Sequence, residues 1–71
     1  MKKVIKLQDL DCANCAAKME DAIAKLAGVN SVNVNFMRQS LTLDAADEQF
    51  DSVLESAKKV AKKIEPDVRF L

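Results

Sequence analysis

The sequence predicts an α+β fold in which two helices pack on one face of a four-stranded antiparallel sheet. Four short segments have the apolar residues typical of strands, and two longer segments repeat apolar residues at helical spacing. Their order is strand, helix, strand, strand, helix, strand. Each helix then has one apolar stripe, and a single half-buried sheet can receive both. This order is the split βαβ, or ferredoxin-like, arrangement.

The first half of the chain is expected to hold two strands and one helix. The segment of residues 3–8 is short and rich in β-forming residues, so it predicts a strand. From Cys15 onward, apolar residues recur every three or four positions, and Gly28 is expected to end this helix in a left-handed cap. Residues 32–36 alternate Val and Phe with Asn, which predicts a second strand.

The second half of the chain is expected to hold a hairpin connection, two strands and a second helix. Residues 37–40 are expected to connect the second strand to a third at residues 41–43. A second helix is expected from near Asp47, and Pro66 ends it. Val68 and Phe70 then alternate in a last short strand. The buried face of the second helix is predicted to comprise Phe50, Val53, Leu54, Ala57, Val60, Ala61 and Ile64.

Charged residues are arranged to favour the dipole of the second helix. Asp44 and Asp47 precede it and are both plausible N-caps at the positive end. Four lysines gather toward the opposite end, where cations are favoured. We interpret them as a solvated face, with docking to an acidic partner as the alternative. They are Lys58, Lys59, Lys62 and Lys63.

The bulk composition indicates one small domain over residues 1–71. Its hydrophobic content of 49% is ample for a compact core. Eleven basic residues balance eleven acidic ones, and there is no Trp or Tyr to stack on bases, so we expect no nucleic-acid partner. We expect no membrane insertion either, because no apolar stretch approaches the ~20 residues that a span requires.

The N-terminal segment also lacks the apolar core of a signal peptide, so we expect a reducing, cytoplasmic location. In that compartment, two closely spaced cysteines indicate metal or redox chemistry more often than a structural bridge. The chain has no His, which removes the commonest imidazole ligand and general base. These features favour a metal-binding domain over an enzyme.

Cys12 and Cys15 are the predicted metal ligands. They lie between the first strand and the first helix, separated by two residues, so both sulfurs can reach one ion. Cys15 is expected in the first helical turn, where free backbone N–H groups and the helix dipole stabilise a thiolate. Two thiolates alone suit near-linear Cu(I) and leave tetrahedral Zn²⁺ two ligands short. The alternative is that both cysteines are ordinary small, partly buried residues.

Asp11 adjoins the first cysteine and is the predicted third ligand. A carboxylate added to two thiolates favours a divalent ion over Cu(I). A second interpretation stays open, because Asp directly before a helix is also a preferred N-cap. By contrast, Met19 lies at core spacing in the helix and is expected to be a core residue rather than a thioether ligand.

These residues together resemble heavy-metal-associated domains. The resemblance rests on Cys12-Ala13-Asn14-Cys15 after a strand, on Gly28-Val29 after a helix and on the following strand at residues 32–35. It covers essentially the whole chain and implies the βαββαβ fold. The family includes small copper chaperones and the N-terminal cytosolic domains of heavy-metal-transporting P-type ATPases.

The residues before the first cysteine divide this family. Copper-handling members usually carry Gly-Met-Thr or Gly-Met-Ser there, whereas this chain has Asp9-Leu10-Asp11. The Asp-Cys-x-x-Cys form is similar to the zinc, cadmium and lead exporters, in which that Asp is taken as a third ligand. The resemblance therefore implies a site for Zn²⁺, Cd²⁺ or Pb²⁺ made by Asp11, Cys12 and Cys15.

The function expected from the sequence is that of a non-enzymatic, monomeric domain of a metal-exporting P-type ATPase. Its partners would be the metal ion and other domains of the transporter, and ATPase activity would belong to a longer parent chain. A stand-alone Cu(I) metallochaperone is the first alternative. A thiol-disulfide oxidoreductase is the second, although the elements are too few for a thioredoxin fold and neither residue between the cysteines is Pro.

Overall fold

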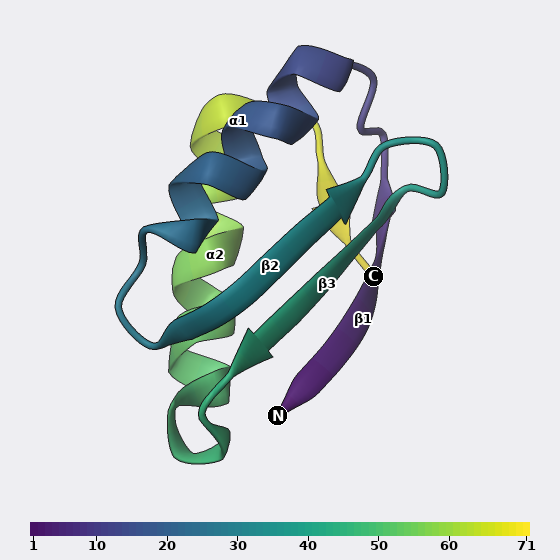
Figure 1. The fold of residues 1–71 in the computed structure, drawn as a ribbon. Helices are drawn as coiled ribbons and strands as arrows, with labels where there is room; N and C mark the ends of the chain where they lie inside the picture. Colours follow the sequence, from purple (N-terminus) through teal and green to yellow (C-terminus); the bar gives the residue numbers. More distant parts are fainter.

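The computed structural model describes all residues 1–71 and has one four-stranded sheet. Its strands are β1 (Lys2–Gln8), β2 (Val29–Asn35), β3 (Ser40–Ala45) and β4 (Arg69–Phe70). The spatial order is β2-β3-β1-β4, and every neighbouring pair is antiparallel (Figure 1). The predicted order of elements along the chain and the antiparallel sheet are thus confirmed. β2 begins earlier than the alternating residues predicted, through a register shift between Val29 and Ser31.

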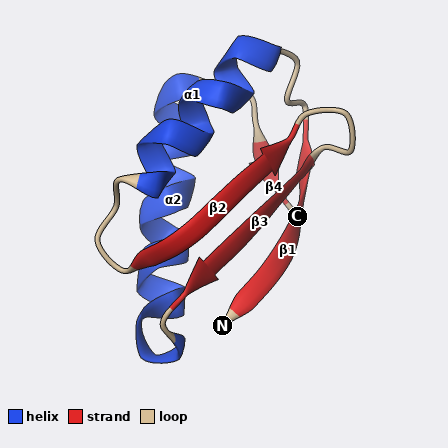
Figure 2. Cartoon of the chain, viewed as in Figure 1, coloured by secondary structure: helices blue, strands red, loops and turns tan.

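Two helices cover one face of this sheet, as predicted (Figure 2). They are α1 (Ala13–Ala24) and α2 (Phe50–Ile64), and a short 3₁₀ helix at Asp47–Gln49 leads into α2. α1 ends four residues before Gly28, so the expected end of this helix at Gly28 is wrong. The intervening turn carries the chain back to the sheet. No helix is both long enough and apolar enough to cross a membrane.

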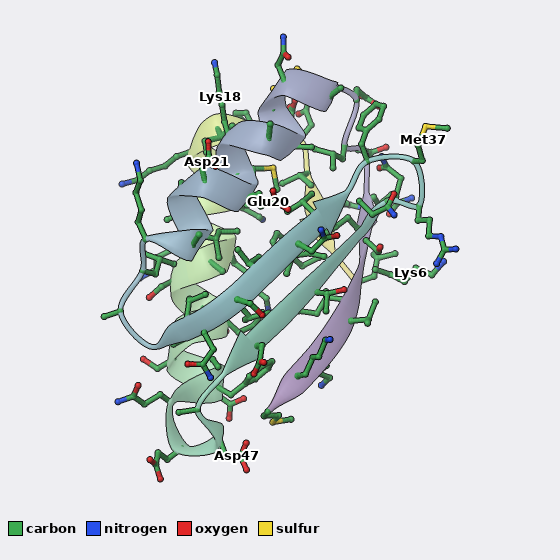
Figure 3. The ribbon with its side chains drawn as sticks, in the orientation of Figure 1. Lys6, Lys18, Glu20, Asp21, Met37 and Asp47 are labelled. Carbon is green, nitrogen blue, oxygen red and sulfur yellow. The ribbon has the colours of Figure 1, made fainter.

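The core lies between the helices and the sheet and contains no buried polar or charged residue. Met19 is fully buried there, which confirms its interpretation as a core residue. At the outer edge of the sheet, Glu20 of α1 (labelled in Figure 3) accepts a hydrogen bond at 2.9 Å from the backbone N–H of Val34. The core residues are Ile5, Leu7, Leu10, Ala16, Met19, Ile23, Leu41, Leu43, Ala45, Phe50, Val53, Ala57, Ala61 and Val68.

Gly28 is required by both its conformation and its surroundings. Its φ is +90°, which an L side chain rarely adopts. A Cβ at this position would lie 2.8 Å from Gln49 Oε1 and 2.9 Å from Val53 Cγ2. The glycine therefore lets the turn before β2 pass close to the start of α2.

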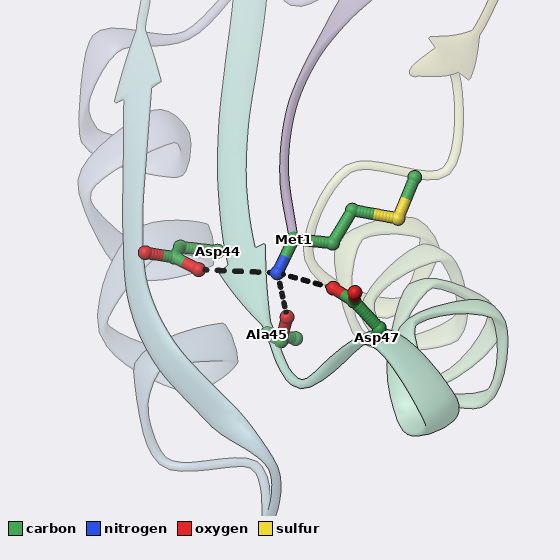
Figure 4. A network of polar contacts seen from close by, with 4 residues as sticks. All are labelled: Met1, Asp44, Ala45 and Asp47. Carbon is green, nitrogen blue, oxygen red and sulfur yellow. Dashed lines mark hydrogen bonds and ion pairs between the residues drawn. The ribbon is translucent and has the colours of Figure 1, made fainter.

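Asp44 and Asp47 do not cap the second helix, which corrects the sequence prediction. The N-cap positions are Ala46 for the 3₁₀ helix and Gln49 for α2, and neither forms a side-chain cap hydrogen bond. The 3₁₀ turn moves the start of α2 to Phe50 and places Asp47 inside the turn. Both carboxylates instead lie near the Met1 ammonium, at 2.8 Å for Asp47 and 3.8 Å for Asp44 (Figure 4).

Candidate metal site

The loop between β1 and α1, residues 9–12, carries the predicted site at one end of the sheet. Asp9 begins the loop with a φ of +64°, a left-handed conformation that Asp tolerates better than most residues. Leu10 follows and buries its side chain in the core, with 2% of its surface exposed. The hairpin between β2 and β3 lies at the same end (Figure 1).

Cys12 is the N-cap residue of α1. Its backbone is extended, with φ −131° and ψ 117°, and its Sγ accepts a hydrogen bond at 3.2 Å from the backbone N–H of Cys15. Its carbonyl oxygen accepts from the N–H of Ala16 at 3.0 Å. The predicted location of Cys15 in the first turn is confirmed. Asp11 lies one residue outside the cap, so the interpretation of Asp11 as the N-cap is wrong.

The two thiols are adjacent and unequal in acidity. Both are free and half-buried. The hydrogen bond from the Cys15 side chain, followed by that from the Cys15 backbone N–H, lowers the pKa of Cys12. The same thiol contact, with burial and the nearby Cys12 charge, raises the pKa of Cys15 to about 11. The expected stabilisation of a thiolate at Cys15 is therefore wrong, because the first-turn N–H of Cys15 donates to the sulfur of Cys12 instead. The pair therefore holds one negative charge on Cys12 more readily than two, and an incoming cation must displace the second proton.

Two charged side chains outside the Cys-x-x-Cys segment act on these sulfurs. Glu65, the C-cap residue of α2, raises the pKa of both thiols through its negative charge. Lys18 on α1 has the opposite, smaller effect on the pKa of Cys15. No local sequence pattern indicates Glu65, because only the packing of α2 beside α1 brings residue 65 near residues 12 and 15.

Asp11 is exposed and lies apart from the two sulfurs in this conformation. No group of three or more His, Cys, Asp or Glu side chains is arranged to hold a metal ion. Asp11 instead lines an open, polar hollow of about 440 Å³ between the loop and the end of α2. The structure thus brings Cys12 and Cys15 together and does not bring Asp11 to them. The other lining residues are Asp9, Lys62, Pro66, Asp67, Val68 and Arg69.

The donor set fits a soft or borderline metal ion. The two thiols are free and adjacent at a helix N-terminus, where the Cys15 N–H favours a thiolate on Cys12, the form that such ions require. Two thiolates satisfy near-linear Cu(I), whereas tetrahedral Zn²⁺ needs two further ligands. Fold and site together therefore define a small metal-binding module of ferredoxin-like architecture.

Comparison with known proteins identifies the family. The family model for the heavy-metal-associated domain matches residues 4–67. The chain is 44% identical over 55 residues to the zinc/cadmium/lead-transporting P-type ATPase of Escherichia coli (strain K12), covering 73% of this chain and 8% of that protein. It is 33% identical over 48 residues to the copper chaperone CopZ of Staphylococcus epidermidis, covering 68% of this chain and 71% of CopZ.

A solved structure shares both the fold and part of the sequence. It is the N-terminal domain of ZntA in the apo-form, with a TM-score of 0.66 and 37% identity, covering 99% of this chain and 90% of that one. The chain belongs to the heavy-metal-associated domain family, whose members are metal-binding modules. It spans about a tenth or less of the length of the transporting ATPases that it matches, and ATPase activity belongs to those larger proteins.

Proposed function

We propose that this domain binds a divalent soft or borderline ion, Zn²⁺, Cd²⁺ or Pb²⁺, through Cys12, Cys15 and Asp11. The observation that carries the proposal is the adjacent pair of reduced thiols at the α1 N-terminus, with a free carboxylate on the preceding residue. Because Cys12 occupies the cap position, capping no longer explains Asp11. The ion is cargo in this proposal, and water or a partner group completes its coordination.

Ligation by Asp11 requires a movement of its side chain. The carboxylate must turn from the polar hollow toward the sulfurs, and its exposure leaves room for this rotation. A divalent cation between two thiolates supplies the attraction, which is strong at close range in a half-buried site. The unliganded and liganded positions of Asp11 would therefore differ, while the sulfurs stay on the first turn of α1.

We further propose that the domain serves as the N-terminal part of a heavy-metal-exporting P-type ATPase, on its cytoplasmic side. The similarity to the E. coli transporter supports this assignment, because it spans most of this chain and a small part of that protein. The domain would receive ions, or tune their delivery, as a monomer. Its contacts would be with other domains of the same transporter.

The test compares Asp11→Ala with Asp67→Ala. Both residues are exposed carboxylates lining the same hollow, and only Asp11 adjoins a cysteine. We expect the Asp11 variant to bind Zn²⁺ about tenfold more weakly, because one charged ligand is lost. The Asp67 variant should bind as the wild type does. The measurement is chelator competition under reducing conditions, with thiolate absorbance and amide shifts locating the ion.

Two results would contradict metal binding by these residues. If Zn²⁺, Cd²⁺ and Pb²⁺ leave the amide signals of residues 11–15 unchanged in the wild type, divalent binding at this site is excluded. If they bind but Asp11→Ala and Asp67→Ala behave alike, Asp11 is not a ligand.

A stand-alone Cu(I) chaperone is the second candidate function. The similarity to CopZ favours it, because the matched segment is most of that small protein. Two thiolates also suffice for Cu(I) without Asp11. This candidate predicts that Cu(I) affinity is unchanged in Asp11→Ala and that the wild type binds Zn²⁺ weakly. The same set of titrations therefore separates the two functions.

A further inference from the structure

Gln39, in the hairpin between β2 and β3, is hydrogen-bonded to both backbone groups of Leu10. Its Oε1 accepts from the Leu10 N–H at 2.9 Å, and its Nε2 donates to the Leu10 carbonyl oxygen at 2.7 Å. Nε2 also donates to the carbonyl oxygen of Phe36 at 2.9 Å. One half-buried amide thus joins the hairpin to the β1–α1 loop across 29 positions of sequence.

The backbone of Gln39 is held in a conformation that this residue type disfavours. Its φ is +52°, in the left-handed region where Gly or Asn is usually found. The carbonyl oxygen of Gln39 accepts from the Leu7 N–H at 2.7 Å, so its position is also fixed to β1. A glycine would satisfy the turn with less strain. The contribution of the glutamine is therefore its side chain, which is aimed at the loop.

We infer that Gln39 is a positioning residue that sets the metal preference of the site by fixing the loop around Asp11. Asp11 lies between two restrained residues, Leu10 held by Gln39 and Cys12 held at the N-cap of α1. The inference rests on the proposed function, in which Asp11 is the third ligand. Fixing the backbone before the ion arrives removes an ordering cost from binding.

The two kinds of ligand depend on different supports. Cys12 and Cys15 are held by the first turn of α1 itself, through the Sγ to N–H bond between them. Asp11 depends on the loop, which is held by the buried Leu10 side chain and by the Gln39 amide bonded to the Leu10 backbone. Loss of the Gln39 side chain should therefore weaken binding of an ion that uses Asp11 and spare binding of Cu(I), which needs only the two sulfurs.

The experiment compares Gln39→Gly, Gln39→Glu and the control Gln8→Ala. Gln39→Gly removes all three side-chain bonds and suits the positive φ, so the turn itself is not strained. Gln39→Glu keeps an acceptor for the Leu10 N–H and loses both donors. Gln8 is an exposed glutamine at the end of β1. Zn²⁺ and Cu(I) affinities are measured for each, together with hydrogen exchange at the Leu10 amide.

We expect Gln39→Gly to weaken Zn²⁺ binding about tenfold, the equivalent of ordering roughly one residue. Its Cu(I) affinity should stay within about twofold, with faster exchange at Leu10 and unchanged exchange in the core strands. Gln39→Glu should weaken Zn²⁺ binding at least as much as Gln39→Gly, because its second carboxylate oxygen faces the carbonyl oxygens of Leu10 and Phe36. Gln8→Ala should match the wild type. Equal losses for both metals, or no loss for Zn²⁺ while the wild type binds it, overturn the inference. A wild type that does not bind Zn²⁺ at residues 11–15 overturns the proposed function, and the inference with it.

Discussion

The starts of the two helices differ sharply although both helices pack on the same sheet. α1 begins behind a cysteine sulfur that accepts a backbone N–H, and its first turn contains no acidic residue. α2 begins behind a 3₁₀ turn, forms no side-chain cap bond and has Asp51 in its first turn, with Asp47 and Glu48 just before it. Carboxylates thus lie in the first turn of α2 and just before it, whereas at the cap of α1 a cysteine sulfur is the side-chain group that accepts a backbone N–H.

This difference separates a helix start that packing fixes from one that presents the proposed metal ligands. The start of α2 is packed against Gly28, and Phe50 and Val53 are buried there, so packing fixes it without a side-chain cap. At the start of α1, by contrast, both cysteines are only half-buried. The first-turn N–H group of Cys15 is directed at the sulfur of Cys12, and a thiolate is the group that a soft metal ion requires.

The largest expected effect is the loss of a sulfur at the α1 start. Cys12→Ser and Cys15→Ser should each weaken Zn²⁺ binding by more than about a hundredfold, because loss of a mere supporting partner already costs 10–100-fold. Ser is itself a good N-cap, so Cys12→Ser should leave α1 intact in circular dichroism. Asp51→Asn at the α2 start is the matched control and should bind Zn²⁺ normally. Comparable losses in all three variants would remove the distinction between the two starts.

The next effect concerns stability at the α2 start. Gly28→Ala should lower the free energy of unfolding by about 2 kcal/mol, through the positive φ and the close contacts of the new Cβ with Gln49 and Val53. Urea denaturation measures it, with the exposed Lys25→Ala as control. The variant should keep its Zn²⁺ affinity under conditions where it is folded. An unchanged unfolding free energy would show that the turn relaxes away from α2.

Taken per pH unit, the smallest expected effect is the pH dependence of binding at the α1 start. Because the pKa of Cys15 is raised to about 11, Zn²⁺ must displace its proton at any pH below that value. Apparent affinity should rise about tenfold per pH unit where only Cys15 is protonated. It should rise more steeply below the lowered pKa of Cys12, where two protons leave.

Competition titrations between about pH 6 and about pH 8.5, with proton release measured by calorimetry in two buffers, would check this dependence. The Asp51→Asn variant should show the same slope as the wild type. An affinity that does not change with pH would mean that the ion does not displace the thiol protons.

The features that could be predicted from the sequence are those that depend on residues close together in the chain. Strand alternation and helical spacing established the order of the elements, because side-chain periodicity follows directly from backbone geometry. The proximity of Cys12 and Cys15 was also predictable from their positions, with two residues between them at a helix start. There the Cys12 sulfur lies beside the N–H of Cys15. Helix boundaries were less accurate: α1 ends at Ala24, and the turn at Asp47 is 3₁₀.

Only the tertiary structure decided how the cysteine pair is held and what surrounds it. Gln39 reaches Leu10 across 29 positions, and Glu65 acts on the thiols from the end of α2, because folding the sheet and packing the helices bring these segments to one end. Asp11 shows the division most clearly. Its sequence position allowed both a cap and a ligand, and the cap was excluded only when the backbone placed Cys12 at the start of α1. The sequence by itself determined which donor atoms are available, since that depends on residue type and spacing. Their support comes from contacts between distant segments, which no local pattern encodes.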